Sequence, residues 1–365
     1  MSANAAAIGL PLNDLETPAL CLDIDAYGRN VTRMLEFLSP HGLAWRPHMK
    51  GQKAPELARE AVARGAIGVT CATLYEAEAM AEAGVSGILI AHQIAGERKL
   101  RRLARLARSA SVIAATDSPQ HAAALDAAAI AEGAVIPLLI EVDVGMHRCG
   151  VQPGEAAAAL AAQVQSSAGL RLEGLMGWEG HTVPMEGAAK TGEVAAACRL
   201  LTETAEMCRA AGIVIGIVSA SGSGTFHESA GHAGLTEVQA GGGVFCDLSY
   251  RKWGLDHEFA LTVLTRIVSR PSPHRIIVDA GFKTMSVQHG APAPIGLPGV
   301  AKLSLSAEHG TIELTGPDES RRVGDTISFV PGYTDSTVCL HDEMCVLREG
   351  VLEAVWAIPG RTGRR

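Results

Sequence analysis

Several common sequence features are missing from this chain of 365 residues, and each absence excludes a class of protein. Eight cysteines are present, but no two of them form a CxxC pair. Their scatter argues against a zinc cluster and against a disulfide framework, and it predicts reduced thiols in a cytoplasmic protein. No run of about 18 apolar residues occurs, so we expect no membrane span. Residues 1–11 lack the basic and apolar regions of a signal peptide.

Positive charge is not in excess either. The formal net charge is −8 at pH 7, and acidic and basic residues are interspersed along the chain. This balance argues against nucleic acid or an anionic membrane as a partner. Hydrophobic residues make up 47% and charged residues 19% of the chain, which predicts a sizeable buried core. The length favours two domains, because single cores rarely grow beyond about 250–300 residues.

Strand-like and helix-like segments alternate through the first part of the chain. The expected strands are continuous apolar runs, as in a parallel sheet that is covered on both faces. They lie at residues 44–50, 68–73, 87–92, 111–117, 137–143, 172–178, 213–219 and 237–241. About eight such β/α repeats in about 210 residues favour a (β/α)8 TIM barrel over an open sheet. No GxGxxG follows the first strand, which argues against a dinucleotide-binding fold.

The pattern changes after about residue 259, where Gly, Pro and Asp separate short strands. These strands are expected at residues 261–269, 275–279, 304–306, 311–315, 325–330, 344–347 and 351–356. We therefore predict an α/β protein in three parts. They are an irregular N-terminal arm (1–16), a (β/α)8 barrel (17–258) and a C-terminal β domain (259–365).

One lysine, Lys50, is expected at the end of the first barrel strand. Active sites of α/β barrels lie at the C-terminal ends of the strands. An amine that is partly desolvated there, among Arg46, His48 and Lys53, can react in its neutral form with an aldehyde to give a Schiff base. The alternative is that Lys50 and Lys53 are ordinary solvated lysines at a helix start.

Other polar residues are expected at the same end of the barrel. They are His48, Thr73, His92, Asp117, Asp143, His147, Arg148, Trp178, Glu179 and His181. Two glycine loops, SASGSGT (219–225) and QAGGGVF (239–245), follow the last two strands, where barrels often bind a phosphate through backbone N–H groups. They could also be two mobile turns. Together with Lys50 they indicate pyridoxal 5′-phosphate (PLP), with its phosphate in the loops and its aldehyde on the lysine.

Four motifs resemble those of the D-threonine aldolase and D-serine dehydratase family, which belongs to the alanine racemase-like (fold type III) PLP enzymes. They are DLETPAL (14–20), RPHMKGQK (46–53), EVDVGMHRCGV (141–151) and GWEGH (177–181), and the resemblance extends over nearly the whole chain. It implies that Lys50 is the Schiff-base lysine, that Arg148 contacts the phenolic oxygen of PLP and that His181 lies against its ring. The implied phosphate ligands are Ser221, Gly222, Ser223, Gly224 and Thr225 with Gly241, Gly242 and Gly243. A homodimer is also implied.

Two departures from the family pattern concern the substrate and the cofactor. Family members carry a His-x-Cys or His-x-Asp pair in the β domain, which binds a divalent metal that grips the substrate's β-hydroxyl. The matching stretch here, VPGYTDSTV (330–338), keeps Asp335 but has Tyr333 in place of the histidine. A phenol is a poor metal ligand at neutral pH, so Asp335 could hold Mg²⁺, Mn²⁺ or Zn²⁺ only weakly. At Gln239 to Gly243 the family's Arg-Pro-Gly is absent, which leaves the partner of the pyridine nitrogen open.

The resemblance implies a PLP-dependent lyase that acts on a β-hydroxy D-amino acid, a small-molecule substrate. The substrate amine would displace Lys50 from its Schiff base. Retro-aldol cleavage or dehydration would follow, with Lys50, His48 or His181 moving protons. One alternative is a metal-independent racemase or epimerase that uses Lys50 and Tyr333, although Tyr333 could equally be a packing residue. Another is a cofactor-binding protein without turnover, which the extra β domain argues against.

Overall fold

The structure, a computed structural model, describes residues 3–361. Within this range the chain forms two compact units. The barrel unit comprises residues 33–50 and 55–241, and the β unit comprises residues 3–32, 51–54 and 242–361. The division into domains at residues 16/17 and 258/259 stays a prediction. None of the helices between residues 3 and 361 is long and apolar enough to span a membrane.

Eight parallel strands form the sheet of the barrel unit in the described residues. They are β2 (Ala44–Trp45), β3 (Val69–Cys71), β4 (Ile88–Gln93), β5 (Val112–Thr116), β6 (Ile136–Glu141), β7 (Leu170–Met176), β8 (Ile217–Ala220) and β9 (Glu237–Val238). Their order is β2-β9-β8-β7-β6-β5-β4-β3, and a parallel bridge between His48 and Thr70 joins the two ends. The predicted (β/α)8 barrel is thereby confirmed.

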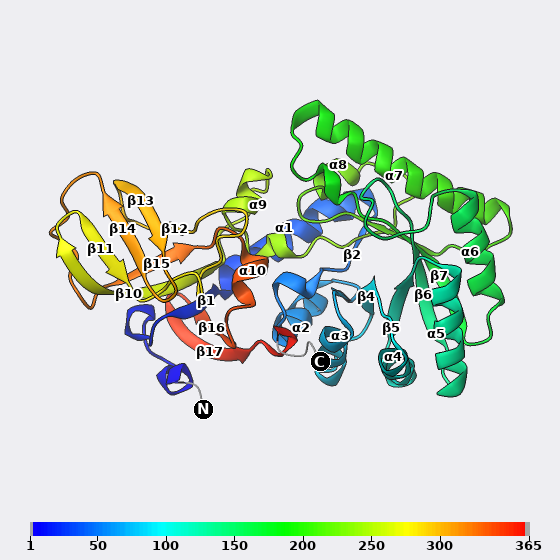
Figure 1. The fold of residues 1–365 in the computed structure, drawn as a ribbon, viewed down its shortest axis with the longest axis horizontal. Helices are drawn as coiled ribbons and strands as arrows, with labels where there is room; N and C mark the ends of the chain where they lie inside the picture. Colours follow the sequence, from blue (N-terminus) through cyan, green and yellow to red (C-terminus); the bar gives the residue numbers. More distant parts are fainter. Residues whose placement is uncertain (1–2, 362–365) are drawn as a thin grey trace. The chain divides into compact units, whose positions relative to one another are not determined.

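Helices cover the outside of this sheet (Figure 1). They are α2 (Pro55–Arg64), α3 (Leu74–Glu82), α4 (Glu97–Ser109), α5 (Pro119–Ala131), α6 (Glu155–Ser166), α7 (Gly187–Ala210) and the short α8 (Phe226–Ser229). Local sequence fixes their starts: the hydroxyls of Thr73 and Ser118 accept hydrogen bonds from the backbone three residues later, at α3 and α5. Apolar stripes then bury one face, as Leu100, Leu103 and Ala104 do in α4.

The β unit contains a nine-stranded sheet in the described residues. Its strands are β1 (Ala19–Asp23), β10 (Leu261–Ser272), β11 (Arg275–Val278), β12 (Ala293–Pro294), β13 (Val300–Leu305), β14 (Gly310–Leu314), β15 (Thr326–Val330), β16 (Glu343–Arg348) and β17 (Val351–Ala357). The main path is β13-β14-β11-β10-β1-β16-β17, and β15 pairs with β10 and β12. All pairs are antiparallel except β1 with β16.

The β unit also contains the short helices α9 (Leu248–Lys252) and α10 (Thr334–Val338). Helix α1 (Ile24–Leu38) has residues in both units.

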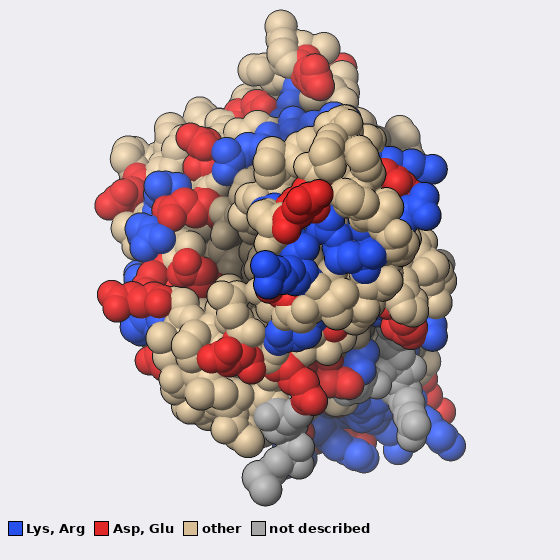
Figure 2. Space-filling model, turned by 90° about the vertical axis from the view of Figure 1, so that its left-hand side faces the viewer, with Lys and Arg blue, Asp and Glu red and all other residues tan. Residues whose placement is uncertain are grey.

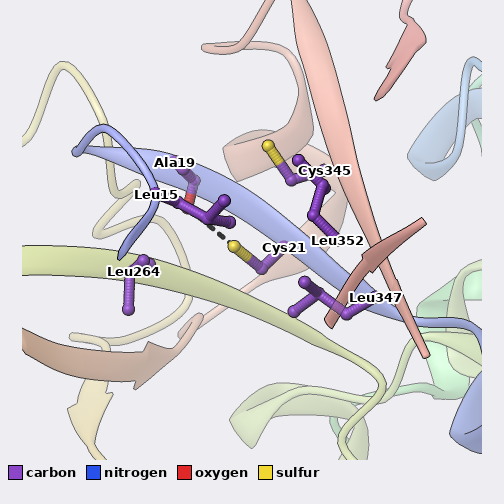
Figure 3. Packing of buried hydrophobic residues seen from close by; sticks show 7 residues of the cluster. All are labelled: Leu15, Ala19, Cys21, Leu264, Cys345, Leu347 and Leu352. Carbon is purple, nitrogen blue, oxygen red and sulfur yellow. Dashed lines mark hydrogen bonds between the residues drawn. The ribbon is translucent and has the colours of Figure 1, made fainter. Parts of the chain in front are cut away.

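A buried cluster around β1 forms part of the core of the β unit (Figure 3). Cys21 of β1 lies between Leu264 of β10 and Cys345 of β16, and Leu15 closes the cluster from the chain before β1. In the barrel, the side chains of Leu89, Ala115, Leu139 and Met176 from β4 to β7 form a second cluster. On the surface, Lys and Arg are interspersed with Asp and Glu over the face that Figure 2 shows.

Several elements differ from the prediction. The strand expected over residues 44–50 ends after Trp45, and Lys50 lies on a single 3-10 turn, Met49–Gly51. The N-terminal arm, where it is described, contains two 3-10 turns, Ala3–Ala7 and Leu12–Asp14. The strand expected over residues 213–219 begins only at Ile217. Helix α10 and strand β12 were not expected.

Candidate active site

Lys50 and Arg148 lie over the same indole ring of the barrel unit. The Nζ atom of Lys50 is 5.3 Å from the centroid of the Trp178 ring, and the Cζ atom of Arg148 is 5.0 Å from it. A cation over an indole face is held by the negative charge of the ring face. Trp178 therefore gathers two positive side chains at the C-terminal ends of the strands, where an anionic cofactor would be attracted.

Buried contacts of β2 fix the turn that carries Lys50. The guanidinium of Arg46 donates two hydrogen bonds to the carboxylate of Glu237, of 2.9 and 2.8 Å, and both side chains are buried. The indole of Trp45 donates to the carbonyl of Ala240 over 2.7 Å. These bonds hold β2 against β9. The backbone N–H of Lys50 then donates to Nδ1 of His48 over 3.3 Å, which orients that ring.

The loop that carries Arg148 is organised by Asp143. Its carboxylate accepts hydrogen bonds from the backbone N–H groups of Gly145 and His147, each 3.0 Å long, and pairs with Nδ1 of His147. Burial pushes the pKa of Asp143 upwards, but these bonds outweigh it and the pKa lies below its ordinary value. The imidazole of His147 itself is exposed, so its visible role is in this loop.

The imidazole of His181 packs against Gly145. A Cβ atom at Gly145 would lie 2.8 Å from Cε1 of His181, so the glycine makes room for the ring. The Nδ1 atom of His181 is buried, and within residues 3–361 it has no hydrogen-bond partner. Such an orphaned polar atom is rare in folded proteins, and it points to a partner that binds from outside the chain.

The first glycine loop is fixed by a buried carboxylate. The backbone N–H of Gly222 donates to the hydroxyl of Thr225, 3.1 Å away, and that hydroxyl donates to Glu179. Glu179 is 1% exposed, and burial raises its pKa. The hydroxyls of Ser221 and Ser229 are 2.5 Å apart. Hydrogen bonds to side chains therefore fix the conformation of this loop.

The glycines of both loops allow close approach. A Cβ atom at Gly222 would lie 3.0 Å from Nε1 of Trp178, and one at Gly224 would lie 3.2 Å from a methyl group of Val183. In the second loop, a Cβ at Gly241 would overlap the backbone of His48. Packing alone thus requires glycine at position 241, whatever the loop binds.

A second group of polar residues lies in the β unit. The hydroxyl of Tyr333 donates to Oδ2 of Asp335, and the hydroxyl of Tyr250 donates to Oδ1 of the same carboxylate, each over 3.1 Å. Burial raises the pKa of both phenols, and the nearby charge of Asp335 raises it further. Both tyrosines therefore stay protonated and donate. Within residues 3–361, no group of three or more His, Cys, Asp and Glu side chains could hold a metal ion.

The structure thus brings the predicted residues together in two sets. Lys50, Arg148, His181 and the loop 221–225 belong to the barrel unit, with Trp178 at their centre. Tyr333 and Asp335 belong to the β unit, as do Gly242 and Gly243. Sequence reasoning missed Tyr250 and the bond from Thr225 to Glu179. No local signal marks Tyr250, because its partner Asp335 is 85 residues further along the chain.

The chain is similar in sequence and in fold to known enzymes. The model of the family "alanine racemase, N-terminal domain" matches residues 22–248, and that of "putative serine dehydratase domain" matches residues 260–347. The chain is 34% identical to D-threonine aldolase of Arthrobacter sp, over 97% of this chain and 94% of that protein. It is 31% identical to 3-hydroxy-D-aspartate aldolase of Paracoccus denitrificans (strain Pd 1222), with the same two coverages.

A solved structure agrees with these sequence matches. The crystal structure of D-threonine aldolase from Filomicrobium marinum superposes with a TM-score of 0.94 at 32% identity, and the match covers 99% of this chain and 100% of that one. The resemblance inferred from the four motifs is thereby confirmed.

Proposed function

Because the chain belongs to the alanine racemase-like family that includes D-threonine aldolase, we propose that it is a PLP-dependent lyase of β-hydroxy D-amino acids. The observation that carries this proposal is the pairing of full-length similarity to D-threonine aldolase with Lys50 on a turn beside Trp178. The catalytic residues that we propose are Lys50 and His48, with Tyr333 considered below.

The residues of the barrel unit fit PLP. Lys50 would hold its aldehyde, and Arg148 supplies a positive charge for its phenolic oxygen. The imidazole of His181 would face the cofactor, and its Nδ1 atom has no hydrogen-bond partner in the described residues. The loop 221–225 would hold the phosphate, and Gly241 is a further candidate in the same unit. Gly242 and Gly243 stay predicted phosphate ligands. When bound, PLP withdraws electrons from the α-carbon of an attached amino acid, which weakens the bonds at that carbon.

The chain's own residues hold the reacting groups in place. The indole of Trp178 fixes the amine of Lys50, and Glu179 fixes the hydroxyl of Thr225 beside the loop. The backbone of Lys50 donates to Nδ1 of His48, so in the neutral imidazole the proton is on Nε2. His48 is the residue that we propose to carry protons at this site, because its ring is oriented by the backbone of Lys50. The role of Asp335 as a metal ligand stays a prediction. The phenols of Tyr250 and Tyr333, which donate to its carboxylate, are poor ligands for a divalent metal ion.

The test is product formation by the PLP-loaded protein. D-Threonine and D-phenylserine should release glycine and an aldehyde, and the L-enantiomers serve as controls. A keto acid with ammonia would indicate dehydration by the same site. Loss of optical rotation with neither product would contradict a lyase and indicate a racemase, in which Tyr333 could act opposite Lys50.

Assembly and location are further parts of the proposal. The family resemblance supports a homodimer, which light scattering on the purified protein would test. Location in the cytoplasm is supported by the cysteines, which in the described residues are all free thiols, and most of them are buried.

A further inference from the structure

One buried carboxyl group joins the two ends of the loop 221–225 in the barrel unit. Glu179 accepts a hydrogen bond from the hydroxyl of Thr225, at the end of the loop. The same carboxyl group is hydrogen-bonded to Ser221, at the start of the loop. All three side chains are buried. The loop therefore closes on a group that is shielded from water.

The backbone at Ser221 needs such a constraint. Its φ angle is 69°, in the left-handed region that residues other than glycine rarely adopt. A strained conformation of this kind persists where the surrounding contacts determine it. Both the backbone N–H and the side chain of Ser221 are hydrogen-bonded to Glu179. Glu179 thus holds the strained start of the loop as well as its end.

The hydroxyl groups beside Glu179 show where the protons lie. The hydroxyl of Ser229 donates to the carbonyl of Phe226 over 3.2 Å. A hydroxyl has one proton, so in the contact of 2.5 Å between Ser221 and Ser229 the donor is Ser221. Ser221 then has no proton left for Glu179, although its side chain is hydrogen-bonded to that carboxyl group. A protonated carboxyl group supplies the missing proton.

The burial of Glu179 acts in the same direction. It raises the pKa of the carboxyl group, and the hydrogen bonds from Thr225 and Ser221 offset this rise only in part. The thiol of Cys198 in α7 interacts electrostatically with Glu179. Burial raises the pKa of this thiol to about 12, so it is uncharged at neutral pH and adds no charge beside the carboxyl group.

A neutral acid at this place suits the binding of a phosphate. A phosphate monoester carries about 1.5 to 2 negative charges at neutral pH. An ionised carboxylate in contact with the loop would repel these charges and weaken binding by about tenfold or more. A protonated Glu179 keeps its hydrogen bonds to both ends of the loop and avoids this repulsion.

We propose that Glu179 is a positioning residue for the phosphate of PLP, and that it holds the loop 221–225 as a neutral carboxylic acid. This inference deepens the proposed function and rests on it, since PLP must bind to this loop. Thr225 donates to the carboxyl group, and the acid proton is donated to the hydroxyl of Ser221. The series of hydrogen bonds continues through Ser229 to the carbonyl of Phe226 in α8.

The first experiment detects the acid proton. Infrared spectra of the PLP-loaded wild-type protein at neutral pH separate the C=O band of a protonated carboxyl group from the bands of ionised carboxylates. We expect such a band to shift in D₂O and to be missing from Glu179→Gln. The matched control is Glu97→Gln, which removes an exposed carboxylate of α4 and should leave the band unchanged. A Glu179→Gln protein that keeps every such band of the wild type would overturn the inference.

The second experiment compares the binding of PLP with that of pyridoxal, which lacks the phosphate. Cofactor absorbance reports the affinity of each ligand for the protein freed of PLP. Glu179→Gln keeps a neutral hydrogen-bonding group, so its affinity for PLP should stay within about threefold of the wild type. Glu179→Leu removes the hydrogen bonds and should weaken PLP binding about tenfold, with pyridoxal binding unchanged.

Two results of the binding experiment would contradict the inference. If Glu179→Gln binds PLP tenfold more tightly than the wild type or better, the carboxyl group of the wild type is ionised. If Glu179→Leu weakens PLP and pyridoxal binding equally, Glu179 has a structural role without selectivity for the phosphate. The infrared spectra and the Glu179→Gln comparison decide the question even if Glu179→Leu does not fold.

The inference and the proposed function can fail separately. Aldehyde release from D-threonine, together with PLP affinities that do not depend on residue 179, would keep the lyase and overturn the inference. A phosphate-selective effect of Glu179→Leu without aldehyde or keto acid from any β-hydroxy D-amino acid would overturn the lyase and keep the role of Glu179.

Discussion

Lys50 is the residue on which the proposed chemistry depends. Lys50→Ala should abolish the visible absorbance of a Schiff base in the PLP-loaded protein and reduce product formation to background, because the proposed Schiff base forms on this amine. The matched control is Lys53→Ala. Lys53 is the second lysine of the same decapeptide, and its amine donates to the carbonyl of Gly360 over 3.5 Å. Absorbance that survives in Lys50→Ala and disappears in Lys53→Ala would assign the Schiff base to Lys53.

Tyr333 is the residue that separates this chain from the metal-binding pattern of the family. Tyr333→His restores a His-x-Asp pair, and imidazole with carboxylate suits Mn²⁺ or Zn²⁺. We expect the variant to take up about one equivalent of Mn²⁺, measured as loss of the free-ion signal in electron paramagnetic resonance. Tyr333→Phe serves as the control and should take up none. Equal uptake by the wild type and the Tyr333→His variant would show that the phenol does not exclude the ion.

At the scale of elements, one ion pair joins β2 and β9, the first and the last barrel strands in chain order and neighbours in the sheet. Arg46 follows β2 and Glu237 begins β9, and both are buried, so removing one partner leaves an uncompensated charge. Glu237→Gln should therefore lower the free energy of unfolding by about 3–5 kcal/mol. The measurement is urea unfolding followed by circular dichroism.

An exposed pair provides the control for this prediction. Arg101 and Glu97 of α4 are 3.0 Å apart, but their side chains are 50% and 80% exposed. Glu97→Gln should cost less than about 1 kcal/mol, since water screens such pairs. Equal costs for the two variants would mean that the Arg46–Glu237 pair contributes little to closing the barrel.

Elements with a strong local pattern were predictable from the sequence. Strands β4 to β7 and the helices between them follow from apolar runs and capping residues such as Ser118. The position of Lys50 on a 3-10 turn was not predictable, because β2 ends where tertiary contacts with β9 end. The strands that pair with β1 were not predictable from the sequence either, because its pairing with β10 and β16 depends on long-range packing.

The candidate site shows the same limit. Lys50, Arg148, His181 and the loop 221–225 were recognisable because short motifs carry them. The contact between Tyr250 and Asp335 joins distant segments that share no motif. It depends on how Asp247 places two short helices, which a linear pattern does not record.

At the scale of the whole molecule, Asp247 makes stability depend on pH. Burial raises its pKa from 3.8 to about 6 in the folded protein. Between these values the folded state keeps a proton that the unfolded state has lost, so this group's contribution to stability falls as pH rises. From pH 4.5 to 7.5, Asp247→Asn should gain about 2 kcal/mol in unfolding free energy relative to the wild type.

Urea unfolding of both proteins at the two pH values measures this change. Asp256→Asn is a suitable control, because the side chain of Asp256 is almost fully exposed. Its stability difference from the wild type should change little with pH. If the Asp247→Asn difference is also constant, Asp247 is ionised throughout this range in the folded protein.

The place of β1 between β10 and β16 has a consequence for biosynthesis. During translation, β1 leaves the ribosome before any strand of its own sheet, and β16 (Glu343–Arg348) is made near the end. All eight strands of the barrel are synthesised in the interval between β1 and β10. The nascent chain can therefore complete its barrel while the apolar edge of β1 has no partner. Until β10 and β16 are made, residues 19–23 have no strand partner, and an unpaired apolar strand can seed aggregation.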